Sequence, residues 1–145
     1  MVIFSKGRRS LTVASIATLV VSAAHTIGTF LPPPADDPAL LAVVEAARGH
    51  HMAMGLGMAP SVWAIQQALS VTMSLFLIAI AVFGLSFAGD RDASPRTLSR
   101  IAVISTGTMA ALTVTYAVFQ IPPPLVSMAV LAILYLVASL RTLRA

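Results

Sequence analysis

Four long apolar stretches, separated by segments rich in proline or charge, dominate the hydrophobic pattern of the chain. They cover residues 11–31, 61–88, 101–121 and 125–140. A backbone in hydrocarbon has to satisfy its own hydrogen bonds, and a helix needs about 20 apolar residues to cross the bilayer. Each stretch is therefore predicted to be a transmembrane helix. The fourth reaches a usual length only if Pro124 and Arg141 extend its ends.

The connection between the first two stretches is long enough to hold structure of its own. Asp37-Pro38 is typical of an N-cap followed by proline at the first helical position, and Gly49 of a helix end, so a short helix is predicted over residues 38–48. One face of this helix is apolar and consists of Leu40, Leu41, Val44 and Ala47. We expect this face to lie on the outer membrane surface or to cap the bundle.

Two other segments have distinct roles in the predicted fold. Residues 50–58 contain glycines and flexible methionines, which suit an adaptable plug better than a rigid helix. Residues 122–124 are three prolines, predicted to form a tight corner that makes the last two helices an antiparallel hairpin. The predicted fold class is thus an all-α membrane protein: a four-transmembrane-helix bundle in a single membrane domain over residues 1–145, with a short amphipathic helix in the first outer loop.

Composition supports a membrane protein and narrows its chemistry. Hydrophobic residues make up 58% of the chain and charged residues 10%, which lies outside the usual range of soluble domains. The chain has no cysteine, which excludes disulfides, thiolate metal sites and thiol nucleophiles. The net charge of +4 would suggest nucleic acid in a soluble protein. Here the basic residues flank apolar stretches, so no nucleic-acid partner is expected and membrane lipids are the expected surroundings.

The basic residues also predict an orientation. Eight of the nine lie in three segments, as Lys6, Arg8 and Arg9; Arg91, Arg96 and Arg100; and Arg141 and Arg144. The positive-inside rule places these segments, and both termini, on the cytoplasmic side of what we expect to be a bacterial inner membrane. A cleavable signal peptide ending near residues 22–24 is an alternative, but the apolar run continues to Leu31, which favours a retained helix.

Polar side chains gather at one depth near the outer ends of three predicted helices. Those at positions 18, 22, 25 and 29 share one stripe of the first helix, and those at 63, 67 and 70 share one stripe of the second. Counting inward at ~1.5 Å per residue places the histidine, the tyrosine and two glutamines roughly 7 to 9 Å below the outer ends. The candidate ligand-binding residues are Ser22, His25, Thr29, Trp63, Gln66, Gln67, Ser70, Tyr116 and Gln120.

This cluster has two interpretations. In the structural one, His25 and the glutamines form hydrogen bonds between helices, while Trp63 and Tyr116 anchor the chain at the interface. In the functional one, they line a pocket that opens toward the outer leaflet, because ionisable residues inside a bilayer often mark functional sites. Outer-loop candidates for its roof are Glu45, Arg48, His50 and His51.

Several chemistries are compatible with the functional interpretation. His25, His50 and His51 could ligate Cu(I) together with methionines, or hold a haem, but their spacing matches no ligand motif, so no metal site is predicted and the cofactor stays unknown. Acid–base catalysis would use His25 as the candidate catalytic base, oriented by Glu45, Tyr116 or a glutamine. All five acidic residues lie outside the spans, which weakens proton-relay and ion-coupled transport. Whether the protein is an enzyme is left open.

Small residues repeat every four positions on two of the predicted helices. One stripe consists of Ala64, Ala68 and Thr72, and the other of Gly107, Ala111 and Thr115. Such stripes allow close backbone approach, so we expect contacts within the bundle, with homo-oligomer or partner-subunit contacts as the alternative.

The sequence from Ala24 to Thr29, AHTIGT, stands before an amphipathic outer insertion and a second helix that begins with a tryptophan. This arrangement resembles small four-helix bacterial integral membrane proteins of uncharacterised families, and the resemblance implies the four-helix layout without any assigned chemistry. The layout is also similar to four-helix membrane isomerases and to small DoxX-like proteins, as an analogy of fold alone.

The sequence therefore favours a protein that binds, and in one version processes, a small lipophilic molecule such as a lipid, an isoprenoid or a quinone in an outer-leaflet polar pocket. The alternative is a non-catalytic accessory subunit that packs against a larger membrane complex through its small-residue stripes.

Overall fold

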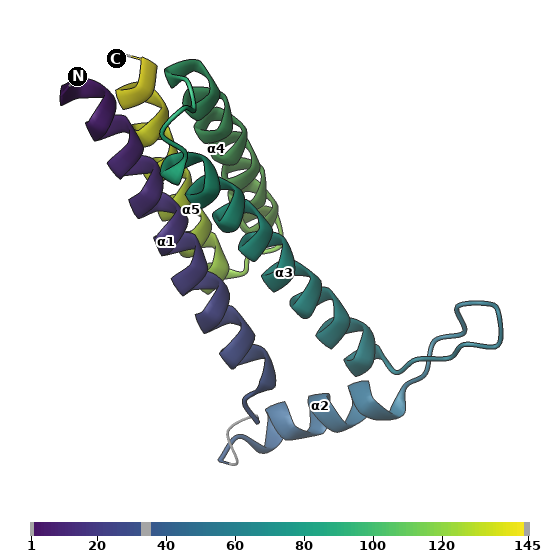
Figure 1. The fold of residues 1–145 in the computed structure, drawn as a ribbon. Coiled ribbons are helices and arrows are strands. Elements are labelled where there is room, and N and C mark those ends of the chain that lie inside the picture. The colour runs from purple at the N-terminus through teal and green to yellow at the C-terminus, as the bar shows by residue number, and fades with distance from the viewer. Residues whose placement is uncertain (1, 33–35, 144–145) are drawn as a thin grey trace. The chain divides into compact units, whose positions relative to one another are not determined.

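The computed structural model describes residues 2–32 and 36–143, with side chains from Lys6 onward. Within these residues the chain forms five helices and no strand: α1 (Val2–Phe30), α2 (Pro38–Gly49), α3 (Val62–Gly89), α4 (Pro95–Val118) and α5 (Pro122–Leu143) (Figure 1). All except α2 are long and apolar enough to cross a membrane. The predicted all-α fold with four transmembrane helices is therefore confirmed, and the chain is an integral membrane protein.

Three helices start earlier than the hydrophobic pattern predicts: α1 at Val2, α4 at Pro95 and α5 at Pro122. In α4 and α5 the reason is that proline can occupy the first turn of a helix. Ser94 caps α4, its Oγ accepting a hydrogen bond from the amide of Thr97 at 3.1 Å, and Pro95 follows it. The three prolines from Pro122 form the first turn of α5, so the prediction that they make the corner is wrong. This start gives α5 22 residues, enough to span a bilayer, and the helix includes Pro124 and Arg141 as predicted.

The corner between α4 and α5 is formed instead by residues 119–121. Gln120 adopts a positive φ of 54°, and the amide of Ile121 donates to the carbonyl of Tyr116 at 3.0 Å. The prediction that Gln120 belongs to a helix over 101–121 is therefore wrong, since the helix ends at Val118. A left-handed residue closes the turn because the chain has to reverse within three residues.

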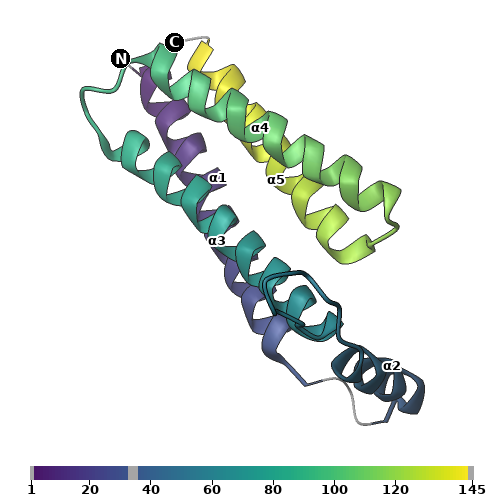
Figure 2. The same ribbon diagram turned by 90° about the vertical axis from the view of Figure 1, so that its right-hand side faces the viewer.

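The chain divides into two compact units, whose boundaries fall inside α1 and α3. Unit 1 contains the residues up to Val21 and those from Leu77 onward, and unit 2 contains Ser22–Phe76. In unit 1, α4 and α5 pack antiparallel along one another, as both ribbon views show (Figures 1 and 2).

The core of unit 1 mixes aliphatic and hydroxyl side chains. Its buried residues include Leu11, Ala14, Ser15, Thr18, Leu77, Ala81, Leu98, Ala102, Met109, Leu131, Tyr135 and Ala138. The phenol of Tyr135, which is fully buried, lies 3.1 Å from the hydroxyl of Thr18. Small side chains allow the helices to come close, as is usual where lipid supplies no hydrophobic driving force between helices.

Close helix approaches occur at two glycines that the sequence analysis did not single out. A Cβ added to Gly7 of α1 would lie 2.5 Å from Cγ2 and 3.2 Å from Cα of Thr142 in α5. A Cβ added to Gly84 of α3 would collide with the Oγ of Ser15 in α1. By contrast, nothing lies within 4 Å of a Cβ at Gly107, so the prediction that its stripe makes contacts within the bundle is wrong.

The other predicted stripe also points outward. Ala64, Ala68 and Thr72 of α3 are exposed, as are Ala111 and Thr115 of α4. Both stripes therefore present small residues to the surroundings of the chain.

One end of unit 1 carries most of the positive charge. The start of α1, the α3–α4 connection and the end of α5 lie at this end, which we call the basic end (Figures 1 and 2). Arg8 holds the connection: its Nη atoms donate to the carbonyls of Ala88, Asp90, Arg91 and Ala93. Arg8 is thus a structural residue as well as a topology signal. Arg144 lies outside the described residues.

Unit 2 consists of the second part of α1, the first part of α3, α2 and the segment after it. Asp37 caps α2 by accepting a hydrogen bond from the amide of Leu40 at 2.9 Å, as predicted from the Asp-Pro pair. The predicted apolar face holds for three of its four residues, since Val44 is buried and Leu41 and Ala47 are half-buried, whereas Leu40 is 38% exposed.

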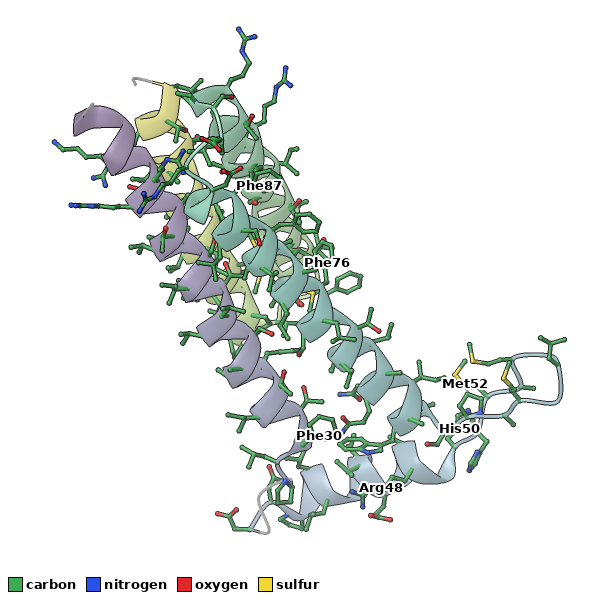
Figure 3. All side chains as sticks on the ribbon, viewed as in Figure 1. Phe30, Arg48, His50, Met52, Phe76 and Phe87 are labelled. Atoms are coloured by element: carbon green, nitrogen blue, oxygen red, sulfur yellow. The ribbon has the colours of Figure 1, made fainter. Side chains whose placement is uncertain are left out.

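The segment from His50 to Ser61 forms a hydrogen-bonded loop and not a rigid helix, as predicted. The amide of Met52 donates to the carbonyl of Pro60, and that of Met54 to the carbonyl of Met58, each at 3.0 Å. Gly55, Leu56 and Gly57 all have positive φ at its tip. Figure 3 shows His50 and Met52 where this loop leaves α2.

Candidate functional site

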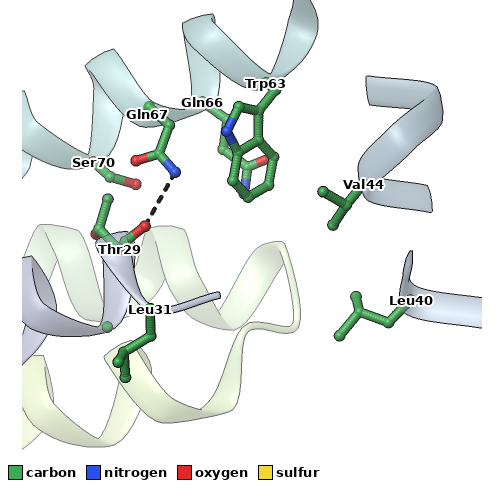
Figure 4. A pocket seen from close by; sticks show the side chains of 9 residues that line it. Thr29, Leu31, Leu40, Val44, Trp63, Gln66, Gln67 and Ser70 are labelled. Carbon is green, nitrogen blue, oxygen red and sulfur yellow. Dashed lines mark hydrogen bonds between the residues drawn. The ribbon is translucent and has the colours of Figure 1, made fainter. Parts of the chain in front are cut away.

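A pocket of about 200 Å³ lies within unit 2, between the ends of α1 and α3 and closed by α2 (Figure 4). Its lining residues are Gly28, Thr29 and Leu31 from α1 and the residue after it, Leu40 and Val44 from α2, and Trp63, Gln66, Gln67 and Ser70 from α3. One side is therefore polar and the other aliphatic, which suits a ligand with both a polar group and an apolar body.

Two hydrogen bonds hold α1 against α3 beside this pocket. The Nε2 of Gln67 donates to the carbonyl oxygen of Thr29 at 3.0 Å (Figure 4), and the Oγ of Ser22 donates to the carbonyl oxygen of Ser74 at 3.0 Å. Because a carbonyl can only accept, the Gln67 amide is fixed with its nitrogen toward α1. The stripes predicted on the first two helices thus meet in unit 2.

Two buried polar atoms in this region have no hydrogen-bond partner among the described residues. They are the Oε1 of Gln67 and the Nε2 of His25. Leaving a polar atom unpaired away from water costs roughly 1–3 kcal/mol. This cost is offset where a further polar group completes the network, and neither atom has such a group among the described residues.

A charged pair on α2 contacts one of the residues that line the pocket. Arg48 and Glu45 of α2 form an exposed ion pair, with Nη1 and Oε1 2.8 Å apart. The Arg48 guanidinium carbon also lies 5.3 Å from the ring centroid of Trp63. A cation above an indole face contributes about 0.5–1 kcal/mol at an exposed site, so this contact fixes the tryptophan ring that lines the pocket.

The structure places some of the predicted site residues in the lining of the pocket and others outside it. Thr29, Trp63, Gln66, Gln67 and Ser70 line the pocket as predicted. His25 and Ser22 belong to the same unit but do not line it, and the hydroxyl of Ser22 is engaged with α3. Tyr116 and Gln120 belong to unit 1.

None of the four residues predicted for the roof, Glu45, Arg48, His50 and His51, lines the pocket. Leu40 and Val44 of α2 close the pocket, whereas His50 and His51 do not line it. His51 instead uses Nδ1 to bond the carbonyl of Ala59 at 2.8 Å, which braces the loop. The signal for the true roof was already in the sequence, because Leu40 and Val44 were on the apolar face predicted for this helix.

The lining also includes Gly28 and Leu31, which the sequence analysis missed as site residues. Gly28 lies one residue before Thr29 and leaves the wall open, since nothing lies within 4 Å of a Cβ built there. In the described part of the chain, no three histidine, aspartate or glutamate side chains gather in a way that could hold a metal ion.

Comparison with protein-family models, with curated proteins and with solved structures returned no match to this chain. Any function therefore has to be argued from the site itself.

Proposed function

We propose that the protein binds a small lipophilic molecule in the unit 2 pocket, and that the polar end of this molecule enters between α1, α2 and α3. The observation that carries the proposal is the division of one pocket into a polar wall, with Gln66, Gln67 and Ser70, and an aliphatic wall, with Leu31, Leu40 and Val44. A site of this kind recognises an amphiphile better than a wholly polar or wholly apolar molecule.

The size of the pocket limits what enters it. Its volume of about 200 Å³ is below the range of roughly 300–1,000 Å³ for sites that enclose a whole drug-sized ligand. The pocket therefore holds a ring or a head group, and the apolar tail of the ligand stays in the bilayer. A lipid, an isoprenoid and a quinone all meet this description.

The orientation belongs to the same proposal. The basic end of unit 1 faces the cytoplasm of a bacterial cell, because loops rich in arginine and lysine stay on that side. Both termini are then cytoplasmic, and the pocket opens toward the outer leaflet of the inner membrane.

Trp63 makes the proposal directly testable, because it lines the pocket and is the single tryptophan of the chain. The protein is purified in native nanodiscs, the small molecules that accompany it are identified by mass spectrometry, and the purified protein is titrated with decylubiquinone, geranylgeraniol and a brominated phosphatidylglycerol. A bound quinone or brominated lipid quenches the indole, and geranylgeraniol shifts its emission to shorter wavelength.

Gln67→Leu is the test variant and Thr72→Val the matched control. Thr72 lies on the same helix, is exposed and bonds only the carbonyl of Ala68 at 2.8 Å. We expect Gln67→Leu to weaken binding of the recognised molecule about tenfold, the effect of losing one hydrogen-bonding group near 1.4 kcal/mol. Equal affinity in both variants would rule out the pocket as the binding site.

The accessory-subunit function is the alternative, and the outward small-residue stripes favour it. Gly107 has open space around it, so another transmembrane helix could approach α4 there. If the purified protein carries only bulk lipid and no probe changes Trp63 emission, whereas another membrane protein co-purifies in fixed ratio, this alternative replaces the pocket proposal.

A further inference from the structure

A second groove lies at the basic end of unit 1, between α1 and α5. It has a volume of about 170 Å³, and its lining residues are Arg9, Ser10 and Val13 from α1 and Leu134, Val137 and Arg141 from α5. Each helix thus contributes one arginine and at least one aliphatic side chain. We call it the arginine groove.

The two walls of the arginine groove are held in register. Near the groove, Gly7 of α1 approaches the backbone of Thr142 in α5 so closely that a Cβ at Gly7 would lie 3.2 Å from the Thr142 Cα. The Nη1 of Arg141 donates to the Oγ of Ser10 at 2.9 Å, and that hydroxyl donates in turn to the carbonyl of Lys6 at 3.0 Å. Arg141 is therefore turned toward α1, the helix that carries Arg9 in the lining of the same groove.

No carboxylate neutralises these two arginines in the described part of the chain. The only ion pair found among those residues joins Arg48 to Glu45 in unit 2. Two guanidinium groups that line one groove without a neighbouring carboxylate favour an anion between them. Guanidinium groups match the oxygens of a phosphate in both geometry and charge.

The aliphatic part of the groove identifies the source of that phosphate. Val13 lies one turn beyond Arg9, and Val137 and Leu134 lie one and two turns before Arg141, so apolar side chains continue about 6–10 Å from the charges on both helices. Val13 is 56% exposed. A free phosphate gains nothing from such walls, whereas the first methylene groups of an acyl chain bury apolar surface against them.

We propose that the arginine groove binds one anionic phospholipid, with its phosphate between Arg9 and Arg141 and an acyl chain along Val13, Leu134 and Val137. Basic grooves between transmembrane helices are suited to anionic head groups. The site is separate from the unit 2 pocket, because all of its residues belong to unit 1.

Native mass spectrometry tests this proposal on the full chain. The protein is incorporated into nanodiscs of equal parts phosphatidylglycerol and phosphatidylcholine, released into detergent, and the lipids that stay bound are counted. We expect one phosphatidylglycerol more than phosphatidylcholine on the native protein. Arg9→Gln and Arg141→Gln should each reduce that excess about tenfold or more, since each removes a charged hydrogen-bonding partner of the phosphate.

Matched variants separate the groove from general charge and from folding. Arg91→Gln removes an arginine from the same end outside the groove and should leave the excess unchanged, and Arg9→Lys keeps the charge and should retain most of it. Val13→Ser should reduce retention severalfold, whereas Val20→Ser, which is exposed on the same helix outside the groove, should not. Gln67→Leu in unit 2 should not affect it either.

Four outcomes would overturn the proposal: equal retention of both lipids, equal loss in Arg91→Gln and Arg9→Gln, no effect of Val13→Ser, or displacement of the lipid by millimolar inorganic phosphate. The last would show an anion site that does not use the acyl chain.

Discussion

Each hydroxyl group has a single proton to donate, and this decides which partner is the donor between Thr18 and Tyr135. The hydroxyl of Thr18 donates to the carbonyl of Ala14 at 2.9 Å, which uses its single proton. In the pair with Tyr135, at 3.1 Å, the phenol must therefore be the donor and Thr18 the acceptor. The sequence places Thr18 on a polar stripe, but it cannot show that the partner lies 117 residues away.

This assignment predicts unequal costs for removing the two partners. Thr18→Val leaves the buried phenol of Tyr135 without an acceptor and should lower the free energy of unfolding by about 1–3 kcal/mol. Tyr135→Phe removes the donor and leaves Thr18 bonded to Ala14, and should cost only about 0.6 kcal/mol. Reversible unfolding in dodecyl sulfate, followed by circular dichroism, measures both.

Thr106→Val is the matched control, because its hydroxyl bonds only the carbonyl of Ala102 in its own helix, at 2.7 Å. It should change stability less than Thr18→Val. A larger cost for Tyr135→Phe than for Thr18→Val would reverse the donor assignment.

Helices of unit 1 come close where one of them has a glycine, as the contact between α1 and α3 shows. Gly84 is buried against Ser15, whose Oγ is also buried and has no hydrogen-bond partner among the described residues. The spacing rule for small residues identifies faces that can approach closely. It does not tell which of these faces do so, since that depends on the rotation of each helix.

Gly84→Ala should therefore destabilise the protein, by about 1–3 kcal/mol, because the new methyl group overpacks the contact with Ser15. Ser15→Ala removes the clashing oxygen, so the double variant should recover at least half of the loss. After that change the nearest atom is the Cβ at position 15, at 3.3 Å. The same unfolding titration measures all three variants.

Gly107→Ala is the control for this experiment, since nothing lies within 4 Å of a Cβ at that position. It should cause no loss of unfolding free energy, so the effect of Gly84→Ala is compared with it directly. Additive effects of Ser15→Ala and Gly84→Ala would mean that the two residues do not touch.

At the scale of the whole molecule, charge and hydrophobicity together predict the topology. Seven of the basic residues lie in the described part of the basic end: Lys6, Arg8, Arg9, Arg91, Arg96, Arg100 and Arg141. Connections with this much positive charge are retained on the cytoplasmic side.

The proposed orientation predicts the outcome of a reporter assay. Green fluorescent protein fused after the last residue should fluoresce in a bacterial host, and alkaline phosphatase fused there should be inactive. Alkaline phosphatase inserted at Gly55, in the loop after α2, should be active, because that loop is then outside. Active phosphatase at the C-terminus would refute the orientation.

The sequence by itself determined the four membrane helices, the cap of α2 and its apolar face, and the stripes of α1 and α3 that meet in unit 2. These follow from local rules: the length needed to cross hydrocarbon, the N-cap preference of aspartate before proline, and the period of the helix. The same capping rule applies to Ser94-Pro95, so the early start of α4 could also have been predicted from the sequence.

Tertiary structure alone decided which residues share a cavity and which helix faces meet. It placed Leu40 and Val44 in one pocket with Gln67, directed Gly107 outward, and brought Arg141 to Ser10. These outcomes depend on the rotation and register of one helix against another. That choice is set by many small packing contacts between distant residues, and no single stretch of sequence contains them.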